Sequence, residues 1–296
     1  MKILLTGPTG FIGSAFARLA LSRGHKVAGL AVPGEGLPAG LERSVTWLRG
    51  TLDAAPWREI AAFAPDLCVH AAWITTPGIY LESPENERFR DWSLAFVRQL
   101  PGVGVTHVVG LGTCVEYRIA PEPLNEERTP AGPTTTYARC KDELRRALEV
   151  EARAGGFGFG WARVFYPYGP GEHSSRLCSV LIAKLRRNEE IVLKTPDSTK
   201  DYIYIGDLAA ALLAVVEKRF CGIINLGTGE GVTVRQMAGF LGQCLGRPDL
   251  VRVAAIPDHD PFPFVVADAA RLKSLGWRQQ VPWQEGLRRL AAAAGG

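Results

Sequence analysis

The sequence has little cysteine, no long apolar run and no block of like charge, and each of these absences excludes a class of protein. Its six cysteines are widely spaced, without a Cys-x-x-Cys pair or a His/Cys cluster, so neither a disulfide framework nor a structural metal site is indicated. The longest apolar run, Leu208–Val216, is far shorter than the ~20 residues that cross a bilayer. The net charge of +4 is spread over 296 residues, which argues against a nucleic-acid partner and against a charged membrane surface.

What is present is the composition of an ordinary globular protein. Hydrophobic residues make up 47% and charged residues 22%, which excludes wholesale disorder. Met1 leads within a few residues into a glycine-rich turn, without the basic and apolar regions of a signal peptide. We therefore expect a cytoplasmic protein with reduced cysteines.

Short apolar runs alternate with helical patterns through the first two-thirds of the chain. Five runs predict buried strands: Lys2–Thr6, His25–Ala31, Asp66–His70, Val105–Leu111 and Gly160–Phe165. Between the first two, apolar residues recur every three or four positions until Gly24 ends the pattern. This alternation predicts an α/β fold with a doubly wound parallel sheet and helices on both faces.

The pattern changes after Phe165, at the rigid turn Tyr166–Gly171. We expect residues 1–165, with returning segments at about 200–230, to form the first domain. Residues 166–199 and 231–296 would form a smaller C-terminal α/β domain for substrate, ending in an amphipathic helix over Leu287–Ala294. The cleft between the two domains is the expected ligand site.

A glycine turn follows the first strand directly. Gly7, Gly10 and Gly13 fit the spacing GxxGxxG, and Ser14 is expected to open a helix. Such glycines let the backbone approach a pyrophosphate at the helix N-terminus, so a dinucleotide-binding sheet of the Rossmann type is predicted. The second strand ends at Ala31, where a carboxylate would select NAD, and this favours NADP(H) over NAD(H). Arg43 or Arg49 could approach a 2′-phosphate there.

Tyr137 and Lys141 lie four residues apart and therefore on one face of a predicted helix. A nearby ammonium lowers the pKa of a phenol from its usual value near 10, so that the phenol can move a proton at neutral pH.

Together with the glycine turn, this pair resembles the short-chain dehydrogenase/reductase superfamily, in its extended branch of nucleotide-sugar epimerases, dehydratases and reductases. Five further segments are similar to blocks of that family: Asp66–Ala72, Gly112–Tyr117, Arg163–Gly171, Lys200–Asp207 and Asn225–Gly229.

The resemblance implies roles for particular residues. Tyr137 would be the acid/base, Lys141 would hold the nicotinamide ribose, and Thr113 would bind the reacting sugar oxygen. The implied cofactor-binding residues are Gly7, Gly10, Phe11, Ile12, Gly13, Ala31, Leu52, Ala71, Ala72, Tyr137, Lys141 and Tyr166. The implied substrate-binding residues are Thr113, Tyr166, Arg176 and Lys200, with no metal. A nucleotide-sugar substrate and a homodimer are implied as partners.

Departures from the family pattern narrow the reaction. Sugar 4,6-dehydratases of this branch carry an Asp-Glu pair after the catalytic Thr, where this chain has Cys114 and Val115. Glu116 comes one place later and is expected to point elsewhere, so dehydration is disfavoured. A phosphate-facing arginine of the family is Lys200 here, and Arg176 is a spare candidate for the phosphate.

The favoured hypothesis is an NADPH-dependent reductase of a nucleotide-activated 4-keto sugar. The alternative is a nucleotide-sugar 4-epimerase with tightly bound NAD, which uses the same three residues. Reduction of a non-sugar carbonyl and a cofactor-binding sensor without catalysis are lesser hypotheses. His70 is interpreted as a hydrogen-bonded core residue, and four aromatic residues are expected to pack a helix or line the cleft: Trp73, Tyr80, Phe89 and Trp92.

Overall fold

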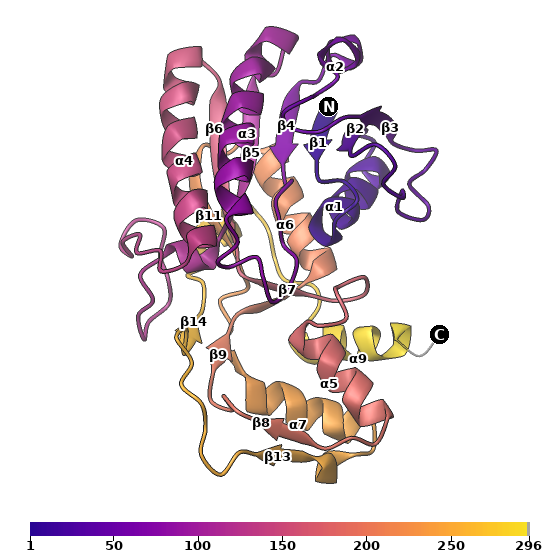
Figure 1. Cartoon of the computed structure of the whole chain (residues 1–296), viewed down its shortest axis with the longest axis vertical. Coiled ribbons are helices and arrows are strands. Elements are labelled where there is room, and N and C mark those ends of the chain that lie inside the picture. Colours follow the sequence, from indigo (N-terminus) through magenta and orange to yellow (C-terminus); the bar gives the residue numbers. More distant parts are fainter. Residues whose placement is uncertain (295–296) are drawn as a thin grey trace.

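The computed structural model describes residues 1–294 and is built around a seven-stranded parallel sheet (Figure 1). The strands are β1 (Lys2–Thr6), β2 (Lys26–Ala31), β3 (Thr46–Arg49), β4 (Leu67–His70), β5 (His107–Thr113), β6 (Gly158–Val164) and β11 (Gly222–Leu226). Their order across the sheet is β11-β6-β5-β4-β1-β2-β3. The chain order reverses at β1, between β2 and β4, and ligands of such sheets bind beyond the carboxyl ends of the strands at this point.

Helices cover both faces of the sheet. One face carries α1 (Phe11–Ser22) and α6 (Ile205–Glu217), and the other carries α2 (Trp57–Phe63), α3 (Glu85–Gln99) and α4 (Thr136–Gly155). Helix α8 (Ala270–Ser274) packs against β11. Each face buries its own apolar cluster, because strands enclosed on both sides alternate their side chains between two cores.

Beside the large sheet, the described chain forms three short sheets, and the helices that accompany them lie in the lower part of Figure 1. The sheets pair β10 (Tyr202–Tyr204) with β7 (Tyr166–Tyr168), β13 (Val251–Val253) with β8 (Ile191–Leu193), and β9 (Thr199–Lys200) with β12 (Val232–Thr233) and β14 (Phe264–Val265). The helices are α5 (Leu177–Arg186), α7 (Val234–Cys244) and α9 (Trp283–Ala293), which share a separate core. Short 3-10 helices lie at Leu100–Val103, Cys114–Glu116 and Pro248–Leu250.

The predicted fold class is confirmed, and the observed ends of strands and helices differ from the predicted ones by a few residues. All five predicted strands form, with β5 and β6 displaced by about two residues from their expected starts. Helix α1 begins at Phe11 rather than at Ser14, because Gly10 is already its N-cap. Strand β3 was not predicted, since its four residues are mostly polar or exposed. No helix within residues 1–294 is long and apolar enough to span a bilayer.

Candidate functional site

The glycine turn between β1 and α1 leaves no room for side chains. Gly7 has φ of 67°, and a Cβ there would lie 2.9 Å from the backbone nitrogen of Ala72. A Cβ on Gly13 would lie only 2.0 Å from the carbonyl oxygen of Gly7. The glycines at these two positions are therefore required by close backbone packing and by a left-handed backbone conformation.

The N-terminus of α1 opens into the cleft without a side-chain cap. Its N-cap, Gly10, makes no side-chain hydrogen bond, so the first-turn N–H groups are free to bind an anion. A pyrophosphate fits this donor set, because backbone N–H groups and the helix dipole both favour negative charge.

The cleft above the turn is a cavity of about 510 Å³. It is lined by most residues predicted to bind cofactor, namely Gly7, Gly10, Phe11, Ile12, Gly13, Leu52, Ala71 and Ala72. Ala31 does not line it: its side chain is 1% exposed, whereas Leu30 and Val32 on either side face the cavity. Side chains alternate along a strand, so Ala31 points to the opposite face and the NADP(H) preference argued from it loses its basis.

A buried hydroxyl holds the wall of this cleft beside the glycine turn. The Thr6 Oγ1 accepts the N–H groups of Ala71 and Ala72, each at 3.1 Å. The same oxygen lies 2.9 Å from His70 Nδ1, and His70 Nε2 lies 2.9 Å from the Ser93 hydroxyl. With two donors already on Thr6, its own proton points to His70, which confirms His70 as a hydrogen-bonded core residue. Burial lowers the pKa of His70 to about 3, so the ring is neutral.

Thr113 ends β5, and a buried carboxylate fixes its backbone. Glu116 Oε1 accepts the Thr113 N–H at 2.7 Å, and its Oε2 pairs with Arg163 Nε at 2.8 Å. Trp161 donates to the same carboxylate, which is fully buried. Glu116 therefore points away from the cleft, as predicted; its place in the core, where Arg163 neutralises its negative charge, was not predicted.

Tyr137 and Lys141 both lie on α4, near Thr113, but the ammonium is directed away from the phenol. Lys141 Nζ donates to the carbonyl of Leu111 at 2.8 Å and lies 3.8 Å from the centre of the Trp73 ring. Burial lowers the pKa of Lys141 to about 7. Burial raises the pKa of Tyr137, with Tyr80 packed edge-on at 5.0 Å between ring centres. The predicted lowering of the tyrosine pKa is thus wrong for this arrangement.

A second cavity of about 380 Å³ adjoins the cleft on the side of the short sheets. Tyr166 lines this cavity and not the cofactor cleft, so of its two predicted roles only the substrate side matches its position. Pro167 and Arg176 line both cavities, so the two cavities lie on either side of these residues.

Lys200 also lines the second cavity but its charge is already engaged. Its Nζ pairs with Asp260 at 2.9 Å, lies 2.7 Å from the Ser198 hydroxyl, and donates to the carbonyl of Phe262. The expectation that Lys200 binds a diphosphate is therefore not met in this geometry. Arg176, half-buried and beside Tyr80, is the cation that faces both cavities.

A group of aromatic residues and the carboxylate of Glu35 also line the cleft. Trp73 lines it and is held by a hydrogen bond from Nε1 to Asn86 Oδ1 at 2.8 Å. Phe89 and Trp92 line it beside Trp73, whereas Tyr80 packs against Tyr137. Glu35 was missed entirely, because it lies in an irregular loop where the only signal was a carboxylate shortly after the end of β2.

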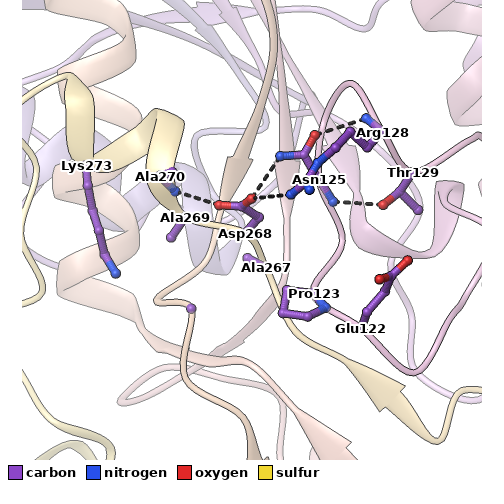
Figure 2. A pocket seen from close by; sticks show the side chains of 11 residues that line it. Glu122, Pro123, Asn125, Arg128, Thr129, Ala267, Asp268, Ala269, Ala270 and Lys273 are labelled. Atoms are coloured by element: carbon purple, nitrogen blue, oxygen red, sulfur yellow. Dashed lines mark hydrogen bonds and ion pairs between the residues drawn. The ribbon is translucent and has the colours of Figure 1, made fainter.

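A third cavity, of about 490 Å³, lies apart from these residues. Figure 2 shows that the Asp268 carboxylate at its centre is held by Asn125, Arg128 and the backbone of Ala270. The side chains of Asp268, Asn125 and Arg128 thus bind one another, and none of the predicted catalytic residues lines this cavity. Across residues 1–294, no group of three or more His, Cys, Asp or Glu side chains is arranged to hold a metal ion.

A Rossmann-type sheet with this glycine turn and a Thr-Tyr-Lys set defines a dinucleotide-dependent oxidoreductase of the extended short-chain class. A model of the NAD dependent epimerase/dehydratase family matches residues 3–227, and the chain belongs to that family. It is 26% identical to the UDP-glucose 4-epimerase of Streptomyces lividans, over 93% of this chain and 91% of that protein. It is 25% identical to the dTDP-6-deoxy-L-talose 4-dehydrogenase of Kitasatospora kifunensis, over 99% and 95%.

Solved structures agree with this assignment. The UDP-glucose 4-epimerase of Thermus thermophilus, in complex with NAD, matches with a TM-score of 0.85 and 26% identity over 100% of this chain and 99% of that one. The fold is also that of the UDP-glucose 4-epimerase of Thermotoga maritima with UDP-glucose, with a TM-score of 0.87 at 23% identity and the same coverage.

Proposed function

We propose that the protein is a nucleotide-sugar 4-epimerase that keeps its NAD bound through the catalytic cycle. The observation that carries this proposal is the inward position of Glu116, beside the buried Cys114 and Val115. With Glu116 turned away from the cleft, the site is equipped to oxidise and reduce a carbinol carbon but not to eliminate water. The near full-length similarity to 4-epimerases favours the epimerase, which was the alternative hypothesis from the sequence, over the reductase.

The residues around the cleft would divide the chemistry between them: Thr113, Tyr137 and Lys141 lie behind its wall and line neither cavity, whereas Ala71, Ala72 and Leu111 line the cofactor cleft. Ala71, Ala72 and Leu111 would lie beside a bound nicotinamide, which would supply reversible hydride transfer. Thr113 holds the sugar oxygen, and the Tyr137 hydroxyl gives a proton to that oxygen when the ketone is reduced. The high pKa of Tyr137 keeps it protonated and ready for this step.

Taking the proton back in the oxidation step requires the ammonium of Lys141 to turn toward Tyr137. Lys141 is held by Leu111 O and by the Trp73 ring, and both contacts are non-covalent and reversible. An ammonium near the phenol favours the phenolate and lowers its pKa. We therefore expect a bound ribose to draw Lys141 off these contacts and complete the acid/base pair.

The substrate would bind across the two adjacent cavities. Its nucleotide would occupy the second cavity, which Tyr166 and Tyr202 both line, with the diphosphate at Arg176 and the sugar toward Thr113. Arginine suits this place because its guanidinium donates two parallel hydrogen bonds to phosphate.

The second candidate is an NADP(H)-dependent 4-ketoreductase. The protonated state of Tyr137 favours it, because a reductase needs the phenol only as a proton donor. The similarity to a sugar 4-dehydrogenase over nearly the whole chain is compatible with it.

Product analysis after incubation with single nucleotide hexoses tests the proposal. We expect UDP-glucose and its 4-epimer to interconvert without added cofactor, and Tyr137→Phe to slow this by about 10²- to 10⁴-fold. Tyr204→Phe, which removes a phenolic hydroxyl that lines neither cavity, serves as the matched control. Absence of epimerisation combined with NADPH-dependent reduction of 4-keto sugars would establish the reductase instead.

A further inference from the structure

The loop after β2 brings a carboxylate to one end of the cofactor cleft. Glu35 lines the cleft together with Leu30, Val32 and the segment from Gly50 to Asp53. Its Oε1 accepts the hydroxyl of Thr9 at 2.7 Å, and Thr9 belongs to the glycine turn. Its Oε2 accepts the backbone N–H of Val32 at 3.3 Å. The carboxylate is therefore tied both to the turn and to the end of β2.

Arg49, at the end of β3, supports the backbone of this loop and does not face the cleft. Arg49 Nη1 donates to the carbonyl of Val32 at 3.2 Å and to the carbonyl of Glu35 at 3.1 Å. Neither Arg49 nor Arg43 lines the cavity. Among residues 1–294, the charged side chains that line this end are Glu35 and Asp53, both acidic, whereas the lining cation Arg176 lies with Pro167 at the substrate side.

We propose that Glu35 is the residue that selects the cofactor: its carboxylate accepts the adenosine ribose hydroxyls and excludes a ribose 2′-phosphate, so that the protein binds NAD(H) in preference to NADP(H). The inference rests on the cofactor assigned under the proposed function. Glu35 thereby binds the ribose hydroxyls from the loop. The residue at the end of β2 cannot do so in this chain, because Ala31 is buried and faces the opposite side of the sheet. A dianionic phosphate beside two carboxylates is repelled, whereas a neutral hydroxyl gains a charge-assisted hydrogen bond.

The test is direct binding of NAD and of NADP to protein stripped of cofactor, measured by calorimetry without any sugar. We expect NAD to bind at least ~10-fold more tightly than NADP, and Glu35→Gln to reduce this ratio by ~10-fold or more. Glu42→Gln is the matched control, since it removes an exposed carboxylate that does not line the cleft. Thr9→Val removes the neutral partner of Glu35 and should keep the ratio well above that of Glu35→Gln.

Two outcomes overturn the inference: a wild-type protein that prefers NADP, or a Glu35→Gln variant with an unchanged ratio. Its failure is separate from that of the proposed function, because the binding ratio is read without substrate. A protein that selects NAD through Glu35 and yet fails to epimerise any sugar would refute only the proposed reaction. Epimerisation with an unchanged ratio in Glu35→Gln would refute only the inference.

Discussion

The cofactor cleft and the substrate cavity share one wall, but they are built from different groups. The part of the cleft that suits a pyrophosphate is backbone: Gly7, Gly13 and the uncapped first turn of α1. The polar groups of the substrate cavity are instead side chains, and some of them already bind one another, as Lys200 does with Asp260. A backbone site depends on neighbours in the sequence, whereas a side-chain site depends on which distant residues the fold brings together.

The same difference appears in the acidic groups. Glu172 in the substrate cavity accepts hydrogen bonds from Ser179 and from the backbone of Gly169, so its carboxylate is satisfied within the protein. Glu35 in the cofactor cleft is exposed and, within the described part of the chain, has one side-chain partner, Thr9. The exposed carboxylate of Glu35 therefore keeps lone pairs that can accept hydrogen bonds from a ligand. In the substrate cavity, the charged group that remains for a ligand is chiefly Arg176.

The largest expected effect comes from filling the backbone turn. In Gly13→Ala, the new Cβ would lie 2.0 Å from Gly7 O, so the turn must open and its N–H groups lose their alignment. We expect NAD affinity to fall by at least ~100-fold, measured by calorimetry on protein whose fold is checked by circular dichroism. Gly239→Ala in α7 is the control: among residues 1–294 nothing lies within 4 Å of its Cβ, and the change should stabilise by up to about 1 kcal/mol. Unchanged NAD affinity in Gly13→Ala would contradict the claim that the cofactor site depends on the backbone geometry of this turn.

The second prediction separates the two cations of the substrate side. Arg176→Gln should raise the KM for the nucleotide sugar by about 10- to 100-fold with little change in stability, because it loses a charge-assisted bond to phosphate. Lys200→Gln should instead lower the free energy of unfolding by about 1–3 kcal/mol, because Asp260 loses its buried partner. Steady-state kinetics and urea unfolding measure both quantities.

Arg187→Gln is the control for the loss of a positive charge, since Arg187 pairs with Glu189 on the exposed surface. A large KM effect in Lys200→Gln, with none in Arg176→Gln, would reverse the assignment. It would mean that the pair with Asp260 opens when substrate binds.

The third prediction concerns the pH dependence of stability at the wall of the cofactor cleft, where the effect appears only when the pH is lowered. The folded pKa of His70 is about 3, below the ordinary value of 6.5, so between these values the unfolded chain binds one more proton than the fold does. The contribution of His70 to the free energy of unfolding is therefore fully present above about pH 6.5. It is lost as the pH falls toward 3. Relative to His70→Gln, the wild type should lose about 2 kcal/mol more between pH 7 and pH 5. Urea unfolding at the two pH values measures it, and parallel losses in both proteins would contradict it.

Much of the fold was predictable from the sequence because its signals are local. Lys2–Thr6 was predicted to the residue as β1, and the other four strands were found with shifts of one or two residues. The four-residue strand β3 escaped, because a short strand with an exposed end carries too little apolar pattern. In the site, the glycine turn was predicted for the same reason as the strands, since its geometry is set by successive residues.

The wrong predictions were those that depended on where a side chain points or on which distant residue it binds. Ala31 was placed on the cleft by its position at the end of β2, but a shift of one residue along a strand reverses the face. The pKa of Tyr137 was expected to fall because Lys141 lies one helical turn away, yet Leu111 O and Trp73 hold the ammonium elsewhere. Lys200 was expected to be free, although Asp260 lies 60 residues later in the chain.

The sequence by itself therefore determined the parallel sheet, the GxxGxxG turn and the positions of Thr113, Tyr137 and Lys141. The sheet, the turn and the Tyr137–Lys141 pair depend on apolar periodicity, on glycine and on helical spacing, which act over a few residues, whereas Thr113 was implied by the family resemblance. Only the tertiary structure decided that Glu116 faces the core, that Lys200 is neutralised and that Glu35 faces the cofactor cleft. Charge interacts through space, so its partners are set by the folded chain and not by the order of its residues.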